Sequence, residues 1–367
     1  MLLSGVLIGT LACSSLPVYG ETIGITADEA VDTANGLTIS EGDGTSATPY
    51  LYESFITIND IATAATAYGV FISNEKFAKL TSSEENPSWD LSVTATSGSD
   101  TSDTADVDTA SDAAGLKVTD GHFTVNGGLN IEVNSVAGEA TTTGGAFNSY
   151  AEALADGLET AQGGAIIING NTDIKIVAQG GTASSDREVG AFIISEGISS
   201  AGTVKIDGDV TMNFDTIAGT ATTNALDPAV ADTSSFSDIV GVFADAGGIA
   251  DITGKLTIDS TIQGGTAISA NDIEAKSGIY AIGVNVSRSG GTINIGDDVA
   301  FTNVSTGGEA RITSGAGDAF AKVEVDALNA SAGSIDITGN MMSDITATGG
   351  KATSDSGEAN ARVDLSG

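Results

Sequence analysis

Residues 290–310 read "GGTINIGDDVAFTNVSTGGEA" and show the repeating pattern of the chain most clearly. Apolar and polar residues alternate on both sides of "GDD", and this period of two predicts two short strands joined by a turn. The stretch ends on a Gly-Gly pair, and close relatives of it recur along the chain. Such recurrence of one supersecondary unit predicts a solenoid, a propeller or an array.

Six units align on the glycine that opens each of them, and their starts lie between 38 and 46 residues apart. These starts are Gly121, Gly164, Gly202, Gly248, Gly291 and Gly333. Two positions further on, most units carry an apolar residue, and the alternation continues through Val125, Ile168, Ile206, Ile252, Ile295 and Ile337. A turn follows at Gly127, Gly170, Gly208, Gly254, Asp297 and Gly339. A second strand then begins at Leu129, Thr172, Val210, Leu256, Val299 and Met341.

The strictest columns close the second strand. They consist of glycines, each followed two residues later by alanine: Gly138, Gly181, Gly219, Gly265, Gly308 and Gly350, then Ala140, Ala183, Ala221, Ala267, Ala310 and Ala352. A column of small residues predicts a corner at which successive backbones approach too closely for a larger side chain. We interpret these columns as a structural signal rather than a catalytic one.

After this corner the sequence predicts a variable loop rich in Ser, Thr and Asp, such as 222–238, and then a third apolar strand. Third strands are expected at 189–195, 239–245, 279–287, 319–325 and 361–366. Pieces of the pattern also occur at 67–73, 91–98 and 113–119. We therefore divide the chain into degenerate or capping repeats at 21–120 and regular repeats at 121–367.

One such unit buries too few apolar side chains to offset the entropy of ordering its strands, so the units must stack. Parallel strands stacked coil upon coil pair their backbones and bury the Ile and Val columns against their equivalents. The sequence thus predicts an all-β, right-handed parallel β-helix. The sequence lacks the signatures of a propeller, of leucine-rich repeats and of hexapeptide helices. Each unit is either one coil with a long loop or two rounder coils, and we favour one coil.

The chain is strongly acidic, with 49 Asp and Glu against 13 Lys and Arg and a formal net charge of −36. A phosphate backbone would be repelled, so we expect no nucleic-acid partner. Aromatic residues make up only 5% of the chain, whereas glycine is abundant, and this composition favours strands and turns over helices.

Residues 1–20, "MLLSGVLIGTLACSSLPVYG", contain a short apolar core followed by small residues. This pattern predicts an export signal peptide, and its apolar run is too short to span a bilayer. Cys13 is the only cysteine, so no intrachain disulfide can form. Lipidation at Cys13 is an alternative, although Thr10 stands where Leu is usual. No other stretch predicts a transmembrane segment.

The sequence gives no residue that we assign to catalysis, to a cofactor or to a metal, and we expect a protein that is not an enzyme. The only histidine, His122, alternates with Phe123 and Val125 and is expected on an outward strand position. The acidic run 99–112 lacks the Gly and terminal Glu of an EF-hand loop, so we interpret it as a solvated loop rather than a specific calcium site. Glu324 and Asp326 share one face of a strand, as acids on any polar face do.

The units "GGTINIGDDVAF", "GTVKIDGDVTMNF" and "GSIDITGNMM", together with the export signal, the Ser/Thr/Asp loops and the acidic charge, resemble the passenger region of a bacterial autotransporter. The resemblance covers residues 36–367 and implies a secreted or cell-surface stalk that acts as an adhesin. It implies an unknown surface ligand, namely a host or bacterial protein or glycan. The chain stops within a unit, as a fragment lacking a C-terminal outer-membrane barrel would.

Two other functions stay open on the sequence. An extracellular polysaccharide lyase or hydrolase would gather carboxylates with a basic or metal partner on one face. A surface-layer or fibre-forming protein would self-associate through an uncovered coil end.

Overall fold

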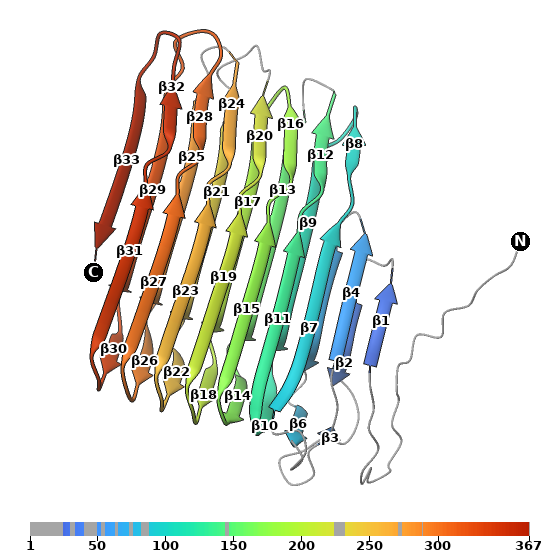
Figure 1. Ribbon diagram of the computed structural model, residues 1–367. Helices are drawn as coiled ribbons and strands as arrows, with labels where there is room; N and C mark the ends of the chain where they lie inside the picture. The colour runs from blue at the N-terminus through green and yellow to red at the C-terminus, as the bar shows by residue number, and fades with distance from the viewer. Residues whose placement is uncertain are drawn as a thin grey trace, which may run out of the picture.

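The computed structural model describes residues 65–72, 88–143, 147–223, 232–270, 274–287 and 289–366 in full, and the backbone of strands at 25–29, 34–39, 50–52, 56–62 and 76–81. These residues form strands and turns, with no helix among them. The strands build four parallel sheets in which consecutive units lie side by side (Figure 1). The predicted all-β parallel solenoid is confirmed, and the hand of its coil stays a prediction. The predicted signal peptide with Cys13 lies outside the described residues.

From β6 onward each coil passes through the four sheets in the same order, by which we number them, and among the strands described before β6 none belongs to sheet 3. Sheet 1 holds β3 (Tyr50–Tyr52), β6 (Lys76–Thr81), β10 (Gly121–Asn126), β14 (Gly164–Asn169), β18 (Thr203–Ile206), β22 (Gly248–Ile252), β26 (Gly291–Ile295) and β30 (Ser334–Ile337). Sheet 2 holds β1 (Ile25–Glu29), β4 (Ile56–Ala62), β7 (Ser88–Ser97), β11 (Gly128–Val136), β15 (Thr172–Gln179), β19 (Val210–Ile217), β23 (Leu256–Gln263), β27 (Val299–Thr306) and β31 (Met341–Thr348).

The other two sheets complete the coil. Sheet 3 holds β8 (Asp100–Ser102), β12 (Glu139–Thr142), β16 (Thr182–Ser185), β20 (Thr220–Thr223), β24 (Thr266–Ser269), β28 (Glu309–Ile312) and β32 (Lys351–Thr353). Sheet 4 holds β2 (Ala34–Ile39), β5 (Ala65–Ile72), β9 (Val107–Val118), β13 (Ser149–Thr160), β17 (Val189–Ser200), β21 (Thr233–Ala244), β25 (Ala275–Val286), β29 (Ala319–Ala330) and β33 (Ala359–Ser366).

The register places the aligned positions of the sequence directly beside one another. In sheet 1, Ile206 pairs with Ile252, which pairs in turn with Ile295. All three side chains are almost fully buried. Every strand of one unit pairs with the equivalent strand of the next, so a unit makes one coil rather than two. Like side chains therefore form continuous files through the interior.

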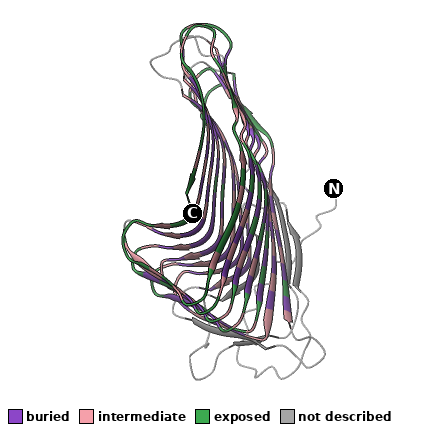
Figure 2. Cartoon of the chain, turned by 60° about the vertical axis from the view of Figure 1, so that its left-hand side comes forward, coloured by how far each residue is buried: buried purple, intermediate pink, exposed green. Residues whose placement is uncertain are grey.

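The expectation of three strands per unit is wrong, because the Gly-x-Ala corner continues into the short strands of sheet 3. In these strands the alanine points inward, and Ala140, Ala183 and Ala221 are fully buried. In "EATT" and "TATT" the second and fourth residues are buried, and the first and third face outward. Alanine is required here because sheet 3 faces the first half of sheet 4 at the narrow end of the coil (Figure 2).

The glycines of this corner confirm the predicted close approach of successive backbones. A Cβ added at Gly181 would lie 1.8 Å from the carbonyl oxygen of Gly138, and one at Gly219 would lie 1.9 Å from that of Gly181. The same clash would recur at Gly265 and Gly308. No side chain fits at such distances, so glycine is obligatory in this column.

The third strands are longer than predicted, and β21 begins inside the stretch that the sequence suggested as a loop. Thr233, Ser235 and Ser237 point inward and are completely buried, although they look like loop residues. Ser235 Oγ donates a hydrogen bond to the carbonyl of Gly219 at 2.9 Å. Strand pairing with β17 and β25 overrides the local sequence preference here.

Sheet 4 bends at a second glycine column, formed by Gly69, Gly115, Gly157, Gly197, Gly241 and Gly283. A Cβ at Gly115 would lie 2.4 Å from Ile131 Cγ2 of sheet 2 and 2.7 Å from the carbonyl of Gly157. The backbone of sheet 4 therefore lies against the side chains of sheet 2 at this level. Past the bend the strands turn away toward sheet 1, and the outward face of sheet 4 is concave (Figure 2).

The predicted pattern pieces before residue 121 belong to the same stack. The segments 67–73 and 113–119 correspond to β5 and β9 in sheet 4, and 91–98 corresponds to β7 in sheet 2. Their inward side chains, such as Val70, Leu91 and Leu116, join the common core. No helix of the described residues is long and apolar enough to cross a bilayer.

Candidate functional site

The outward face of sheet 4 carries a row of four aromatic rings that crosses the strands. Tyr150, Phe192, Phe236 and Tyr280 come from β13, β17, β21 and β25, and we call them the aromatic ladder. Successive ring centroids are 6.4, 6.3 and 6.0 Å apart. The two Phe rings are parallel to within 2°. The ladder thus runs along the stack, with one ring on each of four consecutive coils.

Two outward glycines make room for the rings. A Cβ added at Gly190 would lie 2.1 Å from Phe192 Cε2, and one at Gly278 would lie 2.4 Å from Phe236 Cδ1. Gly190 is the register partner of Tyr150, and Gly278 is the partner of Phe236. The Phe rings therefore lie against bare backbone, and any side chain at these two positions would displace them.

The ladder lies outside the core. All four rings occupy half-buried positions that alternate with buried inward residues of the same strands. Ile194, which follows Phe192 on the same face, is 42% exposed. Ring contacts between neighbouring strands help to hold the coils together, but these rings do not fill the interior, and an aromatic and aliphatic strip on an outward face is typical of an interaction surface.

Three carboxylates lie beside the ladder, Asp108, Glu152 and Asp238, and two more, Asp156 and Glu196, lie further along the same face at the bend of sheet 4. Glu152 is the register partner of Phe192, and Asp238 follows Phe236 by two residues. Burial raises the pKa of all five carboxyl groups. No ion pair joins any of them to a Lys or Arg within the described part of the chain.

Asp156 and Glu196 lie side by side at the bend of sheet 4 as register partners. Burial, and then the neighbouring Glu196, raises the pKa of Asp156 well above its ordinary value. Burial raises the pKa of Glu196 to about 7, with smaller contributions from Asp238, Glu159 and Asp245, and a hydrogen bond from Ser199 opposes the shift. Burial therefore makes both carboxyl groups harder to ionise than exposed ones.

The same face holds two ammonium groups, each between an aromatic ring and a carboxylate. Lys117 Nζ lies 5.0 Å from the centroid of Tyr68 and 2.7 Å from Glu159 Oε2. Lys322 Nζ lies 5.2 Å from the centroid of Tyr280 and also contacts Glu324. The Lys322 contact adjoins the ladder at Tyr280, whereas the Lys117 contact lies past the bend, nine residues along β9 from Asp108, the register partner of Tyr150.

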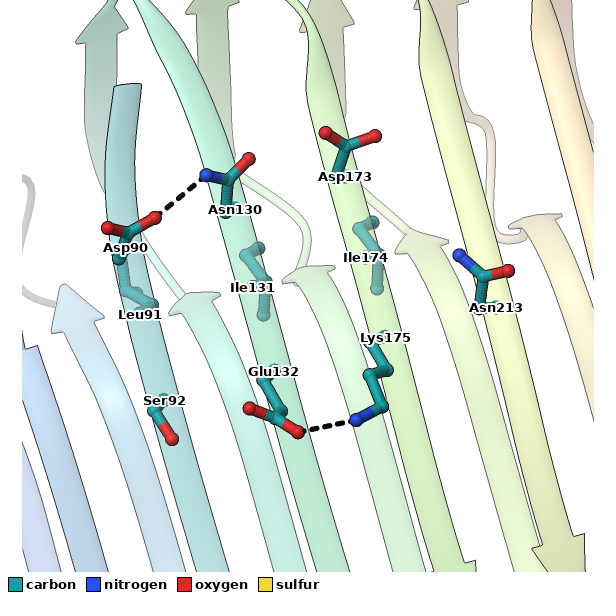
Figure 3. Close-up of a pocket in the computed structure, with 10 residues that line it drawn as sticks. All are labelled: Asp90, Leu91, Ser92, Asn130, Ile131, Glu132, Asp173, Ile174, Lys175 and Asn213. Atoms are coloured by element: carbon teal, nitrogen blue, oxygen red, sulfur yellow. Dashed lines mark hydrogen bonds and ion pairs between the residues drawn. The ribbon is translucent and has the colours of Figure 1, made fainter. Parts of the chain in front are cut away.

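A shallow hollow of about 470 Å³ lies on the outward face of sheet 2 (Figure 3). Its polar side chains pair across the strands, since Lys175 Nζ lies 2.8 Å from Glu132 Oε1 and Asn130 Nδ2 lies 2.7 Å from Asp90 Oδ1. The Lys175 and Glu132 side chains are 58% and 44% exposed. The hollow is an open, shallow face on which four polar side chains already pair with one another.

The residues considered as site candidates from the sequence do not lie together in one site. His122 takes an outward, half-buried position on β10, as predicted. In the acidic run, Asp106 accepts a hydrogen bond from the Asn148 backbone N–H at 2.8 Å, and Asp112 accepts one from the Tyr68 hydroxyl at 3.0 Å. Across the residues described, no cluster of three or more His, Cys, Asp or Glu is arranged to hold a metal ion.

The acid pair on β29 has separate partners. Glu324 contacts Lys322, and Asp326 accepts a hydrogen bond from Ser366. Neither belongs to the acid pair at the bend of sheet 4.

Sequence reasoning missed the aromatic ladder, although a signal for it exists. The four aromatic residues are about one unit apart in the sequence. Phe236, however, falls in the segment predicted as a loop, so the four residues were not aligned with one another. No protein-family model, curated protein or solved structure matches the chain. The candidate site therefore rests on its own geometry.

Proposed function

We propose that the chain is a non-enzymatic, exported β-helical stalk that mediates attachment at a bacterial cell surface, in the manner of an autotransporter adhesin. The stacked coils are the scaffold, and the outward face of sheet 4 is the attachment surface. The observation that carries this proposal is the aromatic ladder, because its rings lie outside the core on four consecutive coils. Large aromatic side chains at a surface are typical of binding sites.

Adhesion of protein-coated beads tests this proposal. Beads carrying the chain are expected to adhere to host-cell monolayers or to bacterial cells. Beads carrying an unrelated protein of similar acidity serve as the control and should adhere far less. Equal retention of both kinds of bead on every surface would contradict an attachment function.

An extracellular polysaccharide hydrolase is a second candidate, favoured by Asp156 and Glu196 at the bend. A carboxyl group whose pKa is near 7 suits a general acid, and glycoside hydrolysis uses two carboxyl groups. Release of reducing ends from a panel of polysaccharides would support this function if Asp156→Asn and Glu196→Gln each abolished it. The stalk proposal expects no release by the unaltered chain.

A further inference from the structure

We infer that the aromatic ladder and its carboxylates bind an extended polypeptide segment with Lys or Arg at alternate positions. The inference rests on the proposed attachment function and names the chemistry of its partner. It draws on three independent properties of the outward face of sheet 4: its charge, its own cation–π contacts and the spacing of its rings.

The first property is uncompensated negative charge beside aromatic rings. Glu152 and Asp238 flank the two Phe rings, and burial raises the pKa of both carboxyl groups. Within the described residues neither has an ion-pair partner, and the chain as a whole carries a formal charge of −36. A cationic partner would relieve this repulsion, whereas an anionic partner would increase it.

The second property is that the face already binds ammonium groups in the proposed manner. Lys117 lies between Tyr68 and Glu159, and Lys322 lies between Tyr280 and Glu324. Phe192 with Glu152, and Phe236 with Asp238, repeat this combination of ring and carboxylate without a lysine of the chain. A lysine or arginine of a partner would complete the same arrangement.

The third property is spacing. Ring centroids follow one another at 6.0 to 6.4 Å, and alternate side chains of an extended peptide are roughly 6.4 to 6.8 Å apart. A peptide lying along the stack would therefore place alternate side chains over successive rings. Its lysine stems would cover Ile194, which is 42% exposed.

The peptide would bind through its side chains. It crosses the strands of sheet 4, whose inner members are already hydrogen-bonded to a strand on each side. The expected mode is therefore not the addition of a strand to a sheet edge. Specificity would come from the alternation of cationic residues rather than from the backbone.

Calorimetric titration of the full chain with synthetic peptides tests the inference. The probe is a twelve-residue peptide in which Lys and Thr alternate. Two control peptides replace every Lys with Glu or group the same lysines in adjacent pairs. The alternating peptide is expected to bind at least fivefold more tightly than the paired one, and the Glu peptide should not bind.

Two double variants locate the site. Phe192→Leu with Phe236→Leu keeps apolar cover over the glycines but removes the π faces, and Glu152→Gln with Asp238→Asn removes two charges. Each should weaken binding of the alternating peptide at least fivefold. Asp173→Asn with Asp215→Asn removes two charges from the face of sheet 2 and is the matched control, which should change affinity less than twofold. Circular dichroism verifies the fold of each variant.

Several results would overturn the inference. They are no binding of the alternating peptide, equal binding of the paired peptide, or equal weakening by the sheet 2 control, which would indicate diffuse attraction to an acidic protein. Binding of a neutral oligosaccharide that depends on Phe192 and Phe236, in place of the peptide, would assign the face to a glycan. If beads adhere to cells but the peptide fails to bind, the attachment function stands and only this partner is wrong.

Discussion

At the scale of single residues, the fold depends on positions where no side chain is tolerated. The corner glycines approach the carbonyl oxygens of the preceding coil so closely that a methyl group would overlap them. The glycines at the bend of sheet 4 have the same role against sheet 2. Backbone packing between coils, rather than conformational freedom, explains why these columns are uniform.

Gly181→Ala is expected to destabilise the chain strongly. The new Cβ would lie 1.8 Å from the carbonyl oxygen of Gly138, so the backbones of two coils must move apart. Overpacking of this kind costs about 3 kcal/mol, equivalent to a fall in Tm on the order of 5 to 10 °C. Thermal unfolding followed by circular dichroism measures the fall.

Gly349→Ala is the matched control for this corner. Its added Cβ would meet only Val363 Cγ2, at 3.3 Å, and a side chain can adjust. A Tm for Gly181→Ala equal to that of Gly349→Ala would contradict the close approach.

At the scale of strands, the sequence predicted the regular parts of each coil and missed the irregular ones. Sheets 1 and 2 were predictable because their Ile, Val and Leu positions alternate strictly around a glycine turn. Sheet 3 was not, because strands such as β12 and β20 consist of small polar residues whose inward positions only the stacking reveals. The start of β21 was missed for the same reason, since Thr233 and Ser237 are buried by their neighbours and not by their own hydrophobicity.

The candidate site was harder to predict than the fold. The aromatic ladder depends on which residues of sheet 4 point outward, and that requires the register of four strands at once. The bend at Gly157 and its equivalents shifts the alternation within each strand, so counting by two along the sequence places Leu158 on the wrong face. The acid pair at the bend follows from the same register and could not be singled out among 49 acids.

The stability of the chain is expected to fall as pH rises from about 5 to about 8. Burial raises the pKa of Glu196 to about 7 in the folded chain, so the folded state binds more protons than the unfolded state within this range. A group of this kind lowers stability as it ionises, by on the order of 1 to 3 kcal/mol. Asp156 shifts in the same direction and adds to the effect.

Glu196→Gln should remove much of this dependence. The Tm of the variant minus that of the unaltered chain is expected to increase from pH 5 to pH 8. Asp251→Asn, an outward residue of β22 away from the bend, controls for the loss of one negative charge. Parallel Tm curves for all three proteins across this range would rule out a buried carboxyl pair at the bend.

At the scale of the whole molecule, one property organises the structure: each unit adds one coil, so position along the stack grows linearly with unit number. The files of buried side chains, the glycine columns and the aromatic ladder all follow from this stacking of one coil per unit. Outward residues of sheet 2 report it directly, because Asp90, Thr257 and Met342 lie on one register line.

Pulsed electron paramagnetic resonance between spin labels on this line is the most direct test. With Cys13 replaced by serine, labels at Asp90→Cys and Thr257→Cys are four strands apart, and labels at Asp90→Cys and Met342→Cys are six strands apart. At about 4.8 Å per strand, stacked coils should give separations of about 19 and 29 Å, a difference of about 10 Å. Equal separations, or a Met342 label closer to Asp90 than the Thr257 label, would contradict the stacked coil.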